Sequence, residues 1–129
     1  MTLNEPAKID PANILIVEDD ENIRFTVELL LQTEGYHVIS ANNGQEALTY
    51  LQTHPSPSLI LLDMTMPVMD GWTFANHLHS QYGHRIPVLV MTAASNAEQR
   101  AKDIQAEGWV SKPFSIEGLL SAVKCHVLH

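Results

Sequence analysis

The chain has 129 residues, of which 45% are hydrophobic and 17% charged, and its formal net charge is −8. This length is enough for one domain with a buried core, and the composition is that of a globular protein rather than a disordered one. The excess of acidic residues argues against direct binding to nucleic acid or to a membrane surface, because both rely on clusters of Lys and Arg.

The first residues of the chain predict no targeting segment. Residues 1–12 are polar, and we expect a flexible leader there, followed by one domain over residues 13–129. The leader lacks the basic start and apolar stretch of a signal peptide, and no apolar run approaches the roughly 20 residues that span a bilayer. The single cysteine, Cys125, cannot form an internal disulfide, so we expect a cytoplasmic protein. We expect Cys125 itself to be buried or half-buried in the last helix.

Short apolar runs predict five strands. The first run is continuous and β-branched, as in a strand buried on both faces. The predicted strands cover residues 14–17, 36–41, 59–62 and 88–91, and a short fifth strand follows Gly108.

A stretch with apolar residues at helical spacing follows each predicted strand. Gly35 is expected to end the first helix, and Asp70-Gly71 to begin the third. Two pairs of residues, Asn43 with Glu46 and Ser95 with Glu98, have the spacing of a capping box at a helix N-terminus. The chain therefore alternates strand and helix as (βα)5, which predicts an α/β fold with a parallel sheet and helices on both faces.

Polar residues lie at the carboxyl ends of the predicted strands, where open α/β sheets bind ligands. The first strand ends in Glu18-Asp19-Asp20, the third in Asp63, the fourth in Thr92 and the fifth in Lys112. Crowded carboxylates repel one another unless a cation binds them, and oxygen ligands suit Mg²⁺ or Mn²⁺ better than zinc. A divalent cation beside a carboxylate, a hydroxyl and an ammonium group favours phosphoryl transfer to or from an aspartate.

Four segments make a more specific comparison possible. The chain contains, in this order, ILIVEDDE, LILLDMTMPVMDG, VLVMTA and GWVSKPF. These segments resemble the signature segments of CheY-like response regulator receiver domains, and the resemblance covers residues 13–128. It implies a flavodoxin-like, doubly wound parallel sheet of five strands in the order 2-1-3-4-5.

The resemblance also implies a role for each residue of the predicted site. Asp63 would be the phosphoacceptor and a metal ligand, Asp20 a direct metal ligand, and Asp19 a ligand through water. The backbone carbonyl of Thr65 would complete the protein ligands. Thr92 would bind a phosphoryl oxygen, Lys112 would pair with the phosphate, and the peptide bond before Pro113 would be cis.

Three further positions concern switching and the lifetime of the phosphate. Trp109 stands where the family usually has Tyr or Phe, an aromatic residue that changes rotamer with the threonine matching Thr92. Trp is bulkier, so a static surface residue is the alternative interpretation of Trp109. Thr65 and Ala94 occupy the positions that tune access of the hydrolytic water in this family.

The resemblance implies a phosphorelay switch and not an enzyme that turns over external substrates. A sensor histidine kinase or a histidine phosphotransfer protein would phosphorylate Asp63, and the face formed by the fourth helix, fifth strand and fifth helix would then bind a downstream protein. One alternative is a pseudo-receiver that keeps the fold without phosphorylation. Another is an aspartyl-phosphate hydrolase, but such enzymes typically carry a second aspartate at the position of Thr65.

Overall fold

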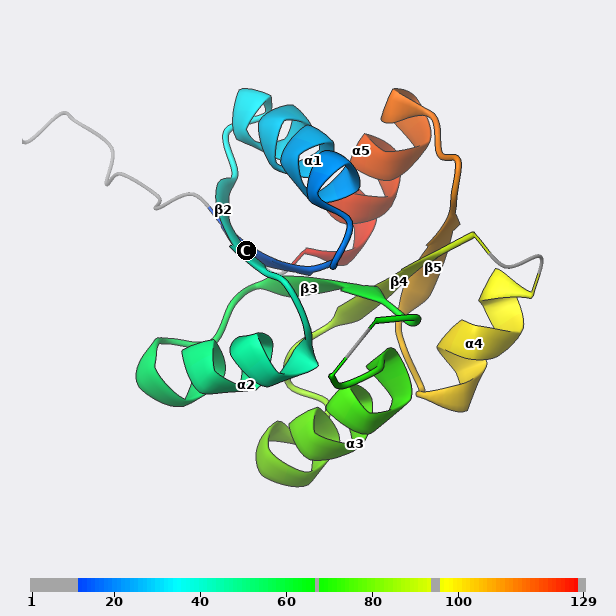
Figure 1. Ribbon diagram of the computed structural model, residues 1–129. Coiled ribbons are helices and arrows are strands. Elements are labelled where there is room, and N and C mark those ends of the chain that lie inside the picture. Colours follow the sequence, from blue (N-terminus) through cyan, green and yellow to red (C-terminus); the bar gives the residue numbers. More distant parts are fainter. Residues whose placement is uncertain (1–11, 67, 94–95, 128–129) are drawn as a thin grey trace, which may run out of the picture.

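The computed structural model describes residues 12–66, 68–93 and 96–127, and within them five parallel strands form one sheet in the order β2-β1-β3-β4-β5 (Figure 1). The strands are β1 (Asn13–Val17), β2 (His37–Ala41), β3 (Leu59–Asp63), β4 (Val88–Thr92) and β5 (Gly108–Ser111). The flavodoxin-like α/β fold and the strand order predicted from the sequence are confirmed. The predicted leader lies almost entirely outside the described residues.

Helices cover both faces of the sheet. They are α1 (Glu21–Thr33), α2 (Gly44–Thr53), α3 (Gly71–Tyr82), α4 (Ala97–Asp103) and α5 (Ile116–His126). In Figure 1, α1 and α5 lie on one face, and α2 and α3 on the other, with α4 beside β5. Each strand leads through a helix to the next, so every site residue at a strand end comes from the same edge of the sheet.

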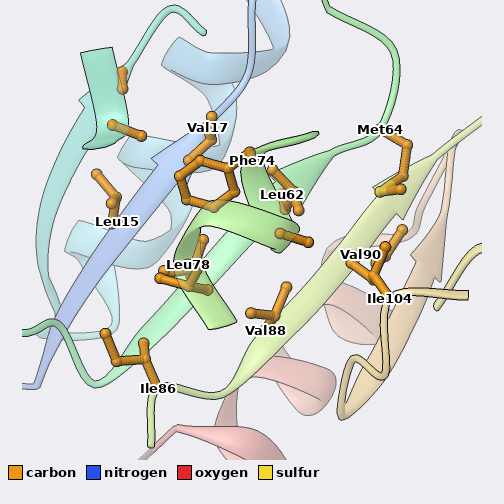
Figure 2. Close-up of a cluster of buried hydrophobic side chains, with 14 of the residues drawn as sticks. Leu15, Val17, Leu62, Met64, Phe74, Leu78, Ile86, Val88, Val90 and Ile104 are labelled. Atoms are coloured by element: carbon orange, nitrogen blue, oxygen red, sulfur yellow. The ribbon is translucent and has the colours of Figure 1, made fainter. Parts of the chain in front are cut away.

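Two buried clusters hold these layers together. Leu15, Val17 and Leu62 point to the face where Phe74 and Leu78 of α3 pack (Figure 2). The alternate strand residues point to the other face and pack against α1 and α5; this cluster includes Ile14, Ile16, Val27, Leu61, Leu119 and Val123. Every residue of β3 and β4 is buried, as their uninterrupted apolar sequences indicate.

Local signals fix the start of each helix to a different degree. The Asn43 side chain accepts a hydrogen bond from the Glu46 backbone N–H at 2.9 Å, so Asn43 caps α2 as predicted. Asp70 caps α3 in the same way, with 2.9 Å to the Thr73 N–H. The predicted cap Ser95 lies outside the described residues. Helix α4 begins at Ala97, and the residue before it, Asn96, makes no side-chain cap hydrogen bond.

Two other expectations can be compared with the structure. Cys125 is exposed, so the expectation of a buried or half-buried residue is wrong. Cys125 follows the core residue Val123 by only two positions, which places it on a different side of α5. Within the described ranges, no helix is both long enough and apolar enough to cross a membrane.

Candidate functional site

A cavity of about 350 Å³ lies at the carboxyl ends of the strands. Its walls come from the loop after β1, the ends of β3 and β4 with the loops that follow them, the residue after β5, and one residue each of α1 and α4. The lining residues are Glu18, Asp19, Asp20, Ile23, Asp63, Thr65, Thr92, Ala93, Arg100 and Lys112. The structure thus gathers in one cavity the acidic, hydroxyl and amino groups that the sequence placed at strand ends.

Asp63 is the last residue of β3 and is only 6% exposed. Burial, a hydrogen bond with Glu18 and the negative charge of Glu18 together raise the pKa of its carboxyl to about 7, against the opposing effects of the Lys112 ammonium and the Thr65 backbone N–H. The Lys112 Nζ lies 3.6 Å from Asp63 Oδ1, and the Thr65 backbone N–H donates to the same oxygen at 3.4 Å. Near neutral pH, Asp63 therefore changes its protonation state easily, and a cation that binds the carboxylate would favour the ionised form.

Glu18 is the first residue after β1 and is 1% exposed. Its Oε1 accepts a hydrogen bond from Lys112 Nζ at 2.5 Å, and its Oε2 accepts one from the Asp20 backbone N–H at 3.2 Å. The Glu18 carboxylate therefore has a cation on one oxygen and an amide on the other, which accounts for its burial.

The two aspartates after Glu18 occupy different positions. Carboxylate oxygens of Glu18, Asp19 and Asp63 all lie within 4.8 Å of one another, a spacing that could hold a metal ion. Asp20 is the N-cap of α1, and its Oδ1 accepts a hydrogen bond from the Ile23 N–H at 3.0 Å. Asp20 lines the same cavity but is not part of this cluster. The structure therefore groups Asp63 with Glu18 and Asp19, rather than with the predicted Asp19 and Asp20.

The sequence carried the signal for this difference, although the predicted ligand set omitted Glu18. Asp20 immediately precedes the helix that starts at Glu21, and an aspartate in that position commonly caps the helix with its side chain. Glu18 directly follows the last residue of β1, so it lies closest to the end of the sheet.

Thr92 and Lys112 meet at the ends of β4 and β5. Thr92 is buried, and its backbone carbonyl accepts a hydrogen bond from the Lys112 N–H at 2.8 Å. The Lys112–Pro113 peptide bond is cis, as the resemblance implied. Both predicted residues thus lie in the cavity with Asp63.

The loop after Asp63 is shaped by a close backbone approach. The Gly71 N–H donates to the Met64 carbonyl at 3.0 Å, and a Cβ at Gly71 would lie 2.8 Å from the Met64 Cα. Only glycine fits this approach without displacing the backbone. Val68 has φ of 69°, which is strained for a β-branched residue and occurs where the surrounding structure imposes it. Pro67, which directly precedes Val68, lies outside the described part of the chain.

Three predicted positions remain. Thr65 lines the cavity. Ala94 lies outside the described residues. Trp109 is on β5, is 44% exposed, and borders a shallow groove with residues of α5.

The donor set fits a hard divalent cation. It consists of carboxylate oxygens, with no His or Cys in the cluster, and oxygen donors suit Mg²⁺ or Mn²⁺. A cation there would offset the repulsion between the negative charges of Glu18 and Asp63.

Comparison with known proteins gives the family. The sequence model described as the response regulator receiver domain matches residues 14–124. The chain belongs to this family.

Curated relatives and solved structures agree with that assignment. The transcriptional regulatory protein PdtaR of Mycobacterium tuberculosis is 37% identical over 121 residues, which cover 91% of this chain and 57% of PdtaR. Response regulator RR06 of Streptococcus pneumoniae is 37% identical over 114 residues, which cover 87% of this chain and 51% of RR06. The chain thus spans about half the length of these curated relatives.

Among solved structures, the chemotaxis response regulator CheY4 of Vibrio cholerae has a TM-score of 0.83 at 35% identity, covering 91% of this chain and 99% of CheY4. The response regulator TrrA of Thermotoga maritima, solved in complex with Mg²⁺ and BeF, has a TM-score of 0.80 at 30% identity and covers 90% of this chain and 99% of TrrA. Receiver domains of this family are signalling switches rather than classical enzymes. They bind Mg²⁺ in an acidic site, accept phosphate from histidine kinases and signal to downstream effectors.

Proposed function

We propose that this chain is the phosphoacceptor switch of a His-Asp phosphorelay and that Asp63 receives the phosphoryl group. The observation that carries the proposal is the position of Asp63: a buried carboxylate at a strand end, with two acids on one side and the Lys112 ammonium 3.6 Å away. A sensor histidine kinase or a histidine phosphotransfer protein would be the donor, and a downstream protein the target. The cytoplasmic location expected from the sequence stays a prediction.

The transfer step follows from these groups. A carboxylate oxygen of Asp63 attacks the phosphorus of a phosphohistidine; the P–O bond forms and the P–N bond breaks, with its electron pair leaving on the imidazole nitrogen. Lys112 stabilises the negative charge on the equatorial oxygens, and the Thr92 hydroxyl donates to one of them. Mg²⁺, when bound, supplies further neutralisation of that charge.

We assign the metal ligands from the cluster of carboxylates. Asp19 and Asp63 would bind the cation with the backbone carbonyl of Thr65, and Glu18 would complete the acidic set. Glu18 replaces Asp20, which was predicted as a direct ligand, because the Asp20 carboxylate caps α1. Thr65 and Ala94 keep their proposed roles in the lifetime of the phosphate.

Incorporation of phosphate from a small-molecule donor tests the proposal. Acetyl phosphate or phosphoramidate with Mg²⁺ should add one hydroxylamine-labile phosphate to the wild type, seen as a mass increase of the intact protein. Asp63→Asn should take up none. Asp103→Asn makes the same acid-to-amide change on the exposed surface of α4 and should be phosphorylated like the wild type.

Equal phosphate incorporation by the wild type and Asp63→Asn would contradict the assignment of Asp63. No incorporation by the wild type, with metal binding demonstrated, would favour the pseudo-receiver, which keeps the fold as an interaction module.

A further inference from the structure

A second cationic side chain reaches the cavity from α4. Arg100 lines it together with Asp63, Thr92 and Lys112, and is half-buried. It is the residue of α4 that takes part in this wall. None of the roles assigned so far uses it.

Arg100 is held by weak contacts. Its Nε donates to the Asn96 side chain, one turn earlier in the same helix, at 3.2 Å. Its guanidinium carbon lies 4.9 Å from the ring centroid of Trp72, which belongs to α3. In the described part of the chain, the guanidinium forms no ion pair with a carboxylate, whereas Lys112 is paired with Glu18 at 2.5 Å.

Phosphorylation of Asp63 would add negative charge to the cavity. An acyl phosphate on Asp63 carries about two negative charges near neutral pH, where the free carboxylate carries at most one. Lys112 shares its charge with Glu18, so phosphorylation adds negative charge that Lys112 alone does not neutralise. The planar guanidinium can donate two parallel hydrogen bonds to phosphate oxygens, which its contact with the half-buried Trp72 ring does not offer.

We propose that Arg100 is a phosphate-binding residue, which leaves the Trp72 ring to bind the phosphoryl group on Asp63; this inference rests on the proposed function above. Movement of the Arg100 side chain from Trp72 to the phosphoryl group would remove a contact between α4 and α3.

The first test measures affinity for beryllofluoride, a mimic of the phosphoryl group, by calorimetry in saturating Mg²⁺. Arg100→Gln should bind beryllofluoride about tenfold more weakly, as expected for the loss of one hydrogen-bonded charge contact. Arg100→Lys should recover part of the affinity, because lysine keeps the positive charge but cannot donate two parallel hydrogen bonds. Lys102→Gln is the matched control: it removes a positive charge from an exposed position of the same helix, where Lys102 pairs with Glu98, and should bind like the wild type.

The second test needs no Arg100 variant to fold. In a Trp109→Phe background, Trp72 is the remaining tryptophan, and its emission should change when beryllofluoride binds, because the cation leaves its ring.

The outcomes separate this inference from the proposed function. If the wild type is phosphorylated at Asp63 but Arg100→Gln keeps its affinity for beryllofluoride, the inference is wrong and the proposed function stands. A constant Trp72 emission, with beryllofluoride binding demonstrated, overturns it as well. If the wild type takes up no phosphate at all, the proposed function fails, and this inference fails with it.

Discussion

Asp63 is an acidic residue in a buried position, where ionisation of the carboxyl is unfavourable. The stability of the protein should therefore depend on pH through this residue. The pKa of its carboxyl is about 7 in the folded protein, against 3.8 as the ordinary value. Between these two values the folded state holds a proton that the unfolded state has released. Ionisation of Asp63 should therefore lower the free energy of unfolding of the metal-free protein as pH rises from about 4 to about 7.

Urea denaturation in EDTA at a series of pH values measures this effect. In Asp63→Asn the side chain cannot ionise, so the decrease between pH 4 and 7 should be smaller than in the wild type by the contribution of Asp63. Identical pH profiles for the two proteins would show that Asp63 ionises in the folded state as it does in the unfolded chain.

At the scale of single residues, the sequence predicted most of the polar side chains that line the cavity, but not which acids lie beside Asp63. Asp63, Thr92 and Lys112 were identifiable because each directly follows or ends an apolar strand. The run Glu18-Asp19-Asp20 was ambiguous, because a shift of one residue decides which carboxylate faces the cavity and which caps α1. That choice depends on where the helix begins, and helix boundaries are the least certain part of a prediction from sequence.

At the scale of elements, β5 and α4 are the part of the fold that we predict to respond to phosphorylation. Trp109 on β5 is 44% exposed, so it still has apolar surface that could be buried. If Thr92 moves toward a phosphoryl group, the space beside β5 could admit the indole. Burial contributes about 25 cal/mol per Å² of apolar area, while overpacking by the larger ring costs about 1–3 kcal/mol.

Tryptophan emission decides between a switching and a static Trp109. In a Trp72→Phe background, beryllofluoride should shift the Trp109 emission to the blue, because the indole enters a less polar environment. Thr92→Ala should weaken the shift. An unchanged spectrum with beryllofluoride bound would mean that Trp109 is static and that signalling proceeds through α4 instead.

The elements themselves were predictable to different degrees. All five strands were identified because their apolar runs are short and bounded by Gly, Pro or acidic residues. The start of α2 was predicted correctly, since Asn43 and Glu46 make the expected bonds. For α4 the spacing of Ser95 and Glu98 predicted a capping box, but Ser95 lies outside the described residues, and Asn96, which directly precedes the helix, makes no side-chain cap hydrogen bond.

For the whole molecule, a divalent cation should stabilise the fold. Mg²⁺ binds the carboxylates only when the strand ends are brought together, so it favours the folded state by about 2.7 kcal/mol at a concentration one hundred times its dissociation constant. The melting temperature should therefore be higher in Mg²⁺ than in EDTA.

Two matched variants test which aspartate after Glu18 binds the metal. Asp19→Asn should lose most of the increase in melting temperature caused by Mg²⁺. Asp20→Asn should keep most of it, because asparagine also caps helices and the Asp20 carboxylate is not in the metal cluster. The reverse result would restore Asp20 as the direct ligand. Equal melting temperatures in millimolar Mg²⁺ and in EDTA for the wild type would contradict the metal site altogether.

The uneven burial of the strands has an evolutionary consequence. Every residue of β3 and β4 is enclosed, whereas Trp109 and Ser111 of β5 are exposed. Substitutions on β3 and β4 must satisfy neighbours on both faces of the sheet, so most of them reduce stability. Substitutions at the outward positions of β5 escape that constraint. The outward surface of β5 can therefore change over evolution without loss of the fold, whereas the strands that end in Asp63 and Thr92 cannot change so freely.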